Sequence, residues 1–264
     1  MKYKLIITDF DGTMAENAIV PEPTVQAIKE YVKKGGKFVI STGRAEGSIK
    51  RVIEKYGLPT LAGTQQGTKI IDTATGEVIS NNGMDWQTAT YVVERLLDKD
   101  PVIVYYGNDM YYNKECRYSD RLNPFCNGHL AEDILQVIKS KKEPVNRIVL
   151  STTEEKVAGY LEELGKLFEG KVLVNSGASY IIEFISLEHN KRESVEILAR
   201  HFNIPYEQVM VVGDSTNDIP LLDGNWHGVA VGSAHPKLKE VAKEVTVPLD
   251  EHPIKHLIEK YCLD

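Results

Sequence analysis

A short apolar run near the amino terminus, Leu5-Ile6-Ile7, leads directly into Asp9-Phe10-Asp11-Gly12. Such a run, ending in polar residues and glycine, is typical of a buried strand that enters a loop. Side chains alternate along a strand, so Asp9 and Asp11 are expected to point the same way. Two ionised carboxylates side by side repel each other. A solvated turn and a site for a hard divalent cation would both accommodate the pair.

The first eighty residues alternate between apolar strands and amphipathic helices. We expect strands at 5–8 and 38–40, a helix that ends near Lys34, and a second helix over 46–56. Apolar strands separated by helices favour a parallel sheet that is covered on both faces. The sequence therefore predicts a layered α/β unit at the start of this chain.

The middle of the chain has a different pattern. Two expected strands flank Gly107-Asn108-Asp109, which indicates a hairpin. Clustered strands with a few helices favour an antiparallel or mixed sheet that has helices on one face. The expected strands are 102–106, 110–113, 147–151, 171–175 and 179–185, and the expected helices lie near 86–97, 131–139 and 154–168. We expect this second unit to occupy residues 83–185.

The alternation of helix and strand returns after this unit. A helix is expected over 192–202, followed by strands at 208–212 and 228–231 and short helices at 220–223 and 238–242. The predicted fold class is therefore α/β, with a doubly wound, mainly parallel sheet built from residues 1–82 and 186–264. An α+β domain at 83–185 is predicted to be inserted into it.

Polar residues follow the expected strands of the parallel sheet. Thr42-Gly43-Arg44 comes after one strand, and a segment from Gly213 to Asp218 comes after another. Ligands bind at the carboxyl ends of strands in open α/β sheets, so these segments are expected to converge. Lys191, near the start of a helix, offers a compact positive charge for phosphate. A helix cap and solvated loops are the alternative interpretations of these residues.

Together these segments match a family pattern. Asp9-Phe10-Asp11-Gly12-Thr13, Thr42-Gly43-Arg44, Lys191 and Gly213-Asp214-Ser215-Thr216-Asn217-Asp218 resemble, in order and spacing, the four motifs of the haloacid dehalogenase superfamily. The insertion resembles the large α/β cap of its Cof-like sugar-phosphatase branch, and the resemblance implies a Rossmann-like core. The loop Gly63-Thr64-Gln65-Gln66-Gly67-Thr68 departs from that branch, which commonly has Asn-Gly-Ala there.

The resemblance also implies roles for individual residues. Asp9 would be the nucleophile, and Asp11 would be the general acid and base, with neighbouring acids favouring a proton on its carboxylate. Thr42 and Lys191 would assist catalysis. The residues implied in binding phosphate and substrate are Phe10, Thr42, Gly43, Arg44, Lys191 and Asn217. Those implied in binding Mg²⁺ are Asp9, Asp11 through its main-chain carbonyl, Asp214 and Asp218.

The resemblance implies a Mg²⁺-dependent phosphatase of small phosphorylated metabolites, sugar phosphates first, acting through an aspartyl-phosphate. A phosphotransferase or mutase with the same intermediate is one alternative, and a non-catalytic phosphate-binding regulator is another. The net charge of −7, without a basic stripe, argues against a nucleic-acid partner. With neither a signal peptide nor a membrane span expected, and three widely spaced cysteines, we expect a cytoplasmic protein.

Overall fold

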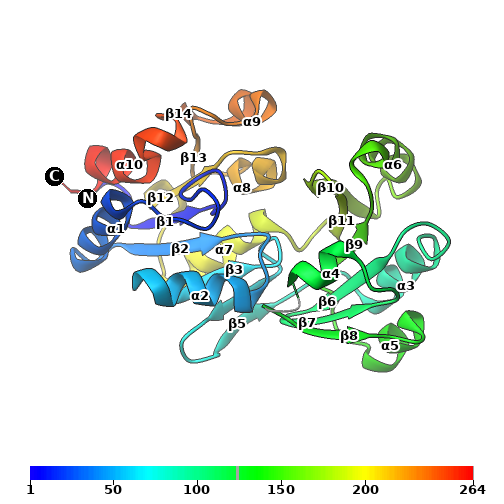
Figure 1. Cartoon of the computed structure of the whole chain (residues 1–264). Helices are drawn as coiled ribbons and strands as arrows, with labels where there is room; N and C mark the ends of the chain where they lie inside the picture. Colours follow the sequence, from blue (N-terminus) through cyan, green and yellow to red (C-terminus); the bar gives the residue numbers. More distant parts are fainter. Residues whose placement is uncertain (123–124, 264) are drawn as a thin grey trace.

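The computed structural model describes residues 1–122 and 125–263, which contain two separate β-sheets (Figure 1). The larger sheet has the strand order β14-β13-β12-β1-β2-β3-β4-β5. Its strands are β1 (Leu5–Thr8), β2 (Lys37–Ser41), β3 (Leu61–Thr64), β4 (Lys69–Asp72), β5 (Val78–Asn81), β12 (Val209–Gly213), β13 (His227–Ala230) and β14 (Glu244–Val245).

The sheet is parallel from β14 to β3, and β1 lies at its centre between β12 and β2. All four residues of β1 are buried, because helices cover both faces of the sheet. The helices of this unit are α1 (Glu22–Lys33), α2 (Glu46–Tyr56), α7 (Lys191–His201), α8 (Ile219–Leu222), α9 (Pro236–Val241) and α10 (Pro253–Tyr261), with 3₁₀ turns η1 (Tyr206–Gln208), η2 (Thr216–Asp218) and η3 (Leu249–Glu251). The predicted doubly wound, mainly parallel α/β core is confirmed.

Two antiparallel strands extend one edge of this sheet. β4 pairs antiparallel with β3, and β5 pairs antiparallel with β4. These strands were not expected from the sequence, because β3 contains Gly63 and strands of four residues are too short to show an alternation of apolar and polar residues. The turn between β3 and β4 holds Gln65 and Gln66 at positive φ, 51° and 62°, in a region that non-glycine residues rarely adopt.

The second sheet has the order β10-β11-β9-β6-β7-β8 and is mostly antiparallel. Its strands are β6 (Val102–Tyr106), β7 (Asp109–Tyr112), β8 (Asn127–Leu130), β9 (Arg147–Ser151), β10 (Val172–Ala178) and β11 (Ile181–Ser186), and its helices are α3 (Trp86–Glu94), α4 (Arg117–Leu122), α5 (Ile134–Lys141) and α6 (Glu154–Leu167). The expected hairpin around Gly107 is confirmed as β6–β7. β8 was not expected, and it pairs parallel with β7.

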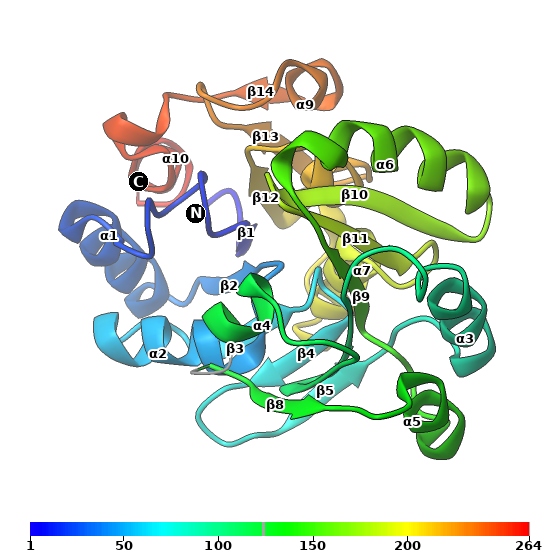
Figure 2. The ribbon, with the colours of Figure 1, turned by 45° about the vertical axis from the view of Figure 1, so that its right-hand side comes forward.

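The two faces of the second sheet have different environments. Residues such as Ile148 and Phe184 pack on one face with apolar residues of α3, α5 and α6, as expected. The other face carries Tyr105 and Val149, and its apolar cluster includes Ala45, which comes just before α2 of the parallel unit. This inner face therefore lies over the first unit (Figure 2).

The strands of the second sheet run between Val102 and Ser186, and those of the first sheet lie on either side of them in sequence. We therefore keep the division at 82/83 and 185/186 as a proposal. Among the helices in the part of the chain that the structure describes, none combines the length and apolar character required to cross a bilayer.

Candidate active site

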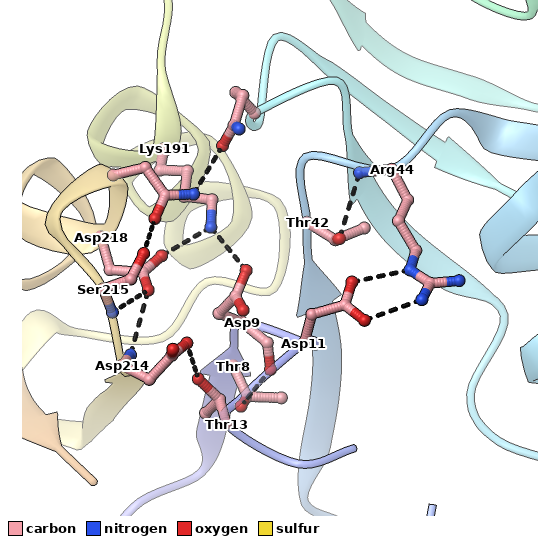
Figure 3. Close-up of polar contacts among 12 residues, drawn as sticks. Thr8, Asp9, Asp11, Thr13, Thr42, Arg44, Lys191, Asp214, Ser215 and Asp218 are labelled. Carbon is pink, nitrogen blue, oxygen red and sulfur yellow. Dashed lines mark hydrogen bonds and ion pairs between the residues drawn. The ribbon is translucent and has the colours of Figure 1, made fainter. Parts of the chain in front are cut away.

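Three strand ends meet at the carboxyl edge of the parallel sheet. Asp9 follows β1, Thr42 follows β2, and Asp214 follows β12 (Figure 3). The N–H of Asp9 donates to the carbonyl of Val212 at 2.8 Å, so the ladder continues one residue beyond β1. Because the strands are parallel and in register, residues separated by more than 200 positions lie side by side.

Lys191 brings together two of the acids at this edge. It is the first residue of α7, which Asn190 caps by accepting a hydrogen bond from the N–H of Arg192. Its Nζ donates to Asp9 and to Asp218, at 2.6 Å in each case, and the side chain is only 1% exposed. Burial lowers the pKa of Lys191, but the two carboxylates outweigh burial and raise it overall. The ammonium group therefore stays charged.

Asp218 positions the loop after β12. Its second carboxylate oxygen accepts the N–H groups of Asp214 at 3.0 Å and Ser215 at 3.1 Å. This capping contact belongs to η2, where Ser215 and Asp218 form a reciprocal box. Both oxygens of Asp218 therefore already accept hydrogen bonds, one from Lys191 and the others from the loop.

Asp214 lies against the first motif. Its Oδ1 accepts a hydrogen bond from the Thr13 hydroxyl at 2.8 Å. A Cβ at Gly12, which has a φ of +81°, would lie 2.4 Å from Asp214 Oδ2, so only glycine allows this approach. Burial first, and then the charge of Asp218, raise the pKa of Asp214 to about 6.

The acids fit a hard divalent cation. Asp9, Asp214 and Asp218 each offer a carboxylate oxygen, and these atoms lie within 4.8 Å of one another. Burial raises the pKa of Asp9 well above its ordinary value; Lys191 opposes this shift, and the two other acids add to it. Crowded carboxylates of this kind can hold a hard divalent cation, because the ion offsets their repulsion.

Asp11 points away from these acids. Its two carboxylate oxygens accept hydrogen bonds from Nε and Nη2 of Arg44, both at 2.7 Å. The sequence pointed to acidic neighbours around this carboxylate, whereas its direct hydrogen-bond partner is the cation Arg44. The pair lies at the cavity rather than behind it: the Asp11 side chain is 50% exposed and that of Arg44 is 24% exposed.

A cavity of about 720 Å³ opens over this edge. The sequence-predicted residues that line it are Asp9, Asp11, Thr42, Gly43, Arg44 and Asn217. Lys191 and Asp218 are buried and Asp214 is half-buried, and these three residues are not part of the cavity lining. Phe10 is fully buried in the core beneath the Arg44 guanidinium, 4.9 Å from its ring centre, so its ring does not contact the cavity.

The second unit contributes lining residues that were not expected from the sequence. Among them are Tyr118 in α4, Arg147 in β9, Tyr180 between β10 and β11, and Glu183 in β11. Gln66, from the turn between β3 and β4, also lines the cavity. A charged residue inside an otherwise apolar strand was the available signal for Arg147 and Glu183. The tyrosines of β6 and β7 are not among the residues that line the cavity, and they pack in the apolar clusters of the second sheet.

The chain resembles known phosphatases over almost its whole length. A family model described as haloacid dehalogenase-like hydrolase matches residues 6–258. Phosphatase YwpJ of Bacillus subtilis is 27% identical, with 97% of this chain and 98% of that protein covered. The 5-amino-6-(5-phospho-D-ribitylamino)uracil phosphatase YwtE of the same organism is 24% identical, with 97% of each covered.

Solved structures show the same fold. A haloacid dehalogenase-like hydrolase from Bacillus subtilis superposes with a TM-score of 0.83 at 25% identity, covering 97% of this chain and 99% of that one. One from Bacteroides thetaiotaomicron superposes with a TM-score of 0.80 at 21% identity, covering 98% and 99%. With the family match and the acids at the strand ends, the chain belongs to the haloacid dehalogenase-like hydrolases, in the Cof-like branch, and is a phosphoric monoester hydrolase.

Proposed function

We propose that this protein hydrolyses small phosphorylated metabolites, sugar phosphates first, in a Mg²⁺-dependent reaction that passes through a phosphorylated Asp9. One observation carries this proposal. Asp9 lines the cavity while a buried lysine and two further acids lie directly behind it. The relatives add support, since one of them is named for a phosphorylated ribityl compound. All three cysteines are free, which suits the reducing cytoplasm in which we place the reaction.

We assign phosphate binding to groups around Asp9. Thr42 and Asn217 carry hydrogen-bond donors at the cavity wall, and Gly43 exposes main chain there. Lys191 lies 2.6 Å from Asp9 and supplies positive charge to the same place. Mg²⁺, bound by Asp9, Asp214 and the main-chain carbonyl of Asp11, would neutralise negative charge on the phosphoryl group.

In the first step, a carboxylate oxygen of Asp9 attacks phosphorus as the bond from phosphorus to the leaving oxygen breaks. Asp11 donates a proton to the leaving oxygen. In the second step, water attacks the phosphorus of phospho-Asp9, and its proton passes to Asp11 while the Asp9 carboxylate is regenerated. Each Asp11 oxygen accepts one hydrogen bond from Arg44, so both proton transfers use a second lone pair of this carboxyl group.

The test is phosphate release from p-nitrophenyl phosphate and from a panel of sugar phosphates, with and without Mg²⁺. We expect metal-dependent release that Asp9→Asn abolishes. Asp109→Asn, in a strand of the second sheet, is the matched control and should retain activity. Phosphate recovered on an added sugar instead of as free phosphate would identify a transferase. Equal background release from wild type and Asp9→Asn would contradict the proposal.

A further inference from the structure

The inner face of the second sheet carries one buried ion pair. Arg147 in β9 and Glu183 in β11 are 3% and 1% exposed, and they are the charged residues of those two strands. Arg147 Nη1 donates to Glu183 Oε1. Glu183 is paired in register with Val149, two residues from Arg147, so both side chains project from the same face.

This ion pair belongs to the wall of the catalytic cavity. Arg147 and Glu183 line it from the second sheet, and Asp9 lines it from the first. When Asp9 attacks phosphorus, the leaving group departs on the opposite side, away from the parallel sheet. The part of the cavity lined by the second sheet is therefore available to the leaving group.

Stability alone does not account for the pair. Removing two charges from water costs several kcal/mol per ion, and apolar residues of similar volume often replace a buried pair without loss of stability. The pair also has unused hydrogen-bonding capacity. Among the described residues, the buried Arg147 Nε has no partner, and each oxygen of Glu183 accepts one hydrogen bond although it has two lone pairs.

Gln66 connects this pair to the phosphate side of the cavity. Its Nε2 donates to Glu183 Oε2 at 2.8 Å, and its Oε1 accepts from Nδ2 of Asn217 at 3.3 Å. The residue is 4% exposed and has a φ of +62°, a backbone conformation that is unfavourable for a non-glycine residue. A strained residue that bridges two walls of a cavity is typical of a functional site.

We propose that Glu183 and Arg147, linked to Asn217 through Gln66, form a leaving-group subsite that selects uncharged, hydroxyl-bearing groups such as sugars and polyols. The inference rests on the proposed function and narrows its substrate class. A hydroxyl group both donates and accepts, so it matches a cavity wall where the guanidinium of Arg147 lies beside the carboxylate of Glu183. The paired charges sum to zero, so a second phosphate gains no net attraction from them and meets the carboxylate of Glu183.

The test compares kcat/KM for sorbitol 6-phosphate, fructose 1,6-bisphosphate and p-nitrophenyl phosphate. Wild type should favour sorbitol 6-phosphate over the bisphosphate. In Glu183→Gln, which leaves Arg147 without its counter-charge, the ratio of sorbitol 6-phosphate to p-nitrophenyl phosphate activity should fall roughly tenfold to a hundredfold, and the bisphosphate should gain relative to sorbitol 6-phosphate. Glu162→Gln, on the exposed face of α6, should change neither ratio.

A second variant separates specificity from folding. Asparagine tolerates positive φ better than glutamine, but its side chain is one methylene shorter. Gln66→Asn should therefore keep or raise the thermal midpoint while the link to Glu183 is lost and the same substrate ratio falls. If both variants lower activity on all three substrates by the same factor, the ion pair has only a structural role and the subsite is excluded.

The design also distinguishes failure of the subsite from failure of the proposed function. Asp9-dependent release from p-nitrophenyl phosphate with a preference for the bisphosphate would overturn the subsite and leave the phosphatase in place. If no ester is hydrolysed, calorimetric binding of sorbitol 6-phosphate to Asp9→Asn, with and without Glu183→Gln, still tests the subsite. Equal affinity in the two proteins would overturn it.

Discussion

At the scale of single residues, Asp214 gives the site a pH dependence. Burial and Asp218 raise its pKa to about 6 from an ordinary value of 3.8. A group with a raised pKa in the folded state contributes stability that is present below its unfolded value and is lost as pH rises through 6. Without metal, this group alone should therefore stabilise the protein at pH 5 relative to pH 7.5, by at most about 2 kcal/mol.

Mg²⁺ should reverse this trend, because it binds the ionised form of Asp214. We expect Mg²⁺ to raise the thermal midpoint more at pH 7.5 than at pH 5. Thermal unfolding with excess Mg²⁺ or with EDTA, at both pH values, measures the difference. Asp214→Asn should remove most of it, and an equal Mg²⁺ effect at the two pH values in wild type would contradict this prediction.

Individual residues also show how much of the site could be predicted from the sequence. Asp9 and Asp214 each follow an apolar strand, so the edge where they meet could be predicted from parallel pairing alone. The pairing of Asp11 with Arg44 could not be predicted, because Asp11 lies two residues beyond Asp9 in a loop, and the course of a loop has no periodic sequence pattern. The position of Gln66 depends on a turn conformation that glutamine rarely adopts.

At the scale of elements, the start of α7 fixes the position of Lys191. Asn190 accepts the N–H of Arg192 at 2.9 Å and donates to the carbonyl of Leu187 at 2.8 Å. Asn190→Ala should lower the free energy of unfolding by about 1 kcal/mol. Without the cap, the ammonium of Lys191 should no longer be held at hydrogen-bond distance from Asp9 and Asp218. We expect kcat to fall roughly tenfold.

Urea unfolding and steady-state kinetics measure the two effects of this substitution. Asn190→Asp is the control, because aspartate also caps helices through a side-chain oxygen; it loses the bond to the Leu187 carbonyl and should restore part of the stability. An unchanged kcat in a destabilised Asn190→Ala protein would show that Lys191 is held by its two carboxylates alone.

The helices and strands that could be predicted from the sequence are mainly those whose periodic pattern of apolar residues extends over many positions. α6 was expected over 154–168 and spans Glu154–Leu167, because fourteen residues display several turns of helical periodicity. β14 has two residues and β8 has four exposed ones, so neither presents an alternation of buried and exposed positions. Their place in a sheet is decided by neighbouring strands, which a local pattern does not contain.

At the scale of the whole molecule, the two units contact each other directly beside the cavity. The start of α2 in the parallel unit meets the turn between β6 and β7 of the second unit at Gly47. The Gly47 N–H donates to Asn108 Oδ1 at 3.0 Å, and a Cβ at Gly47 would lie 2.1 Å from the carbonyl oxygen of Phe125. The close approach of the two units therefore requires glycine inside a helix, where alanine would otherwise be favoured by about 1 kcal/mol.

Gly47→Ala should show whether the close contact between the two units keeps the cavity closed, because it favours the helical conformation of α2 but adds a methyl group at the contact. The methyl group overlaps the second unit, so the two units should open, and kcat/KM for sugar phosphates should fall roughly tenfold as water enters the cavity. Small-angle X-ray scattering should report a larger radius of gyration. Gly159→Ala, in α6 with no atom within 4 Å of an added Cβ, should stabilise its helix and change neither kinetics nor size. Identical scattering and kinetics in Gly47→Ala and wild type would mean that the second unit shifts to accept the methyl group without opening.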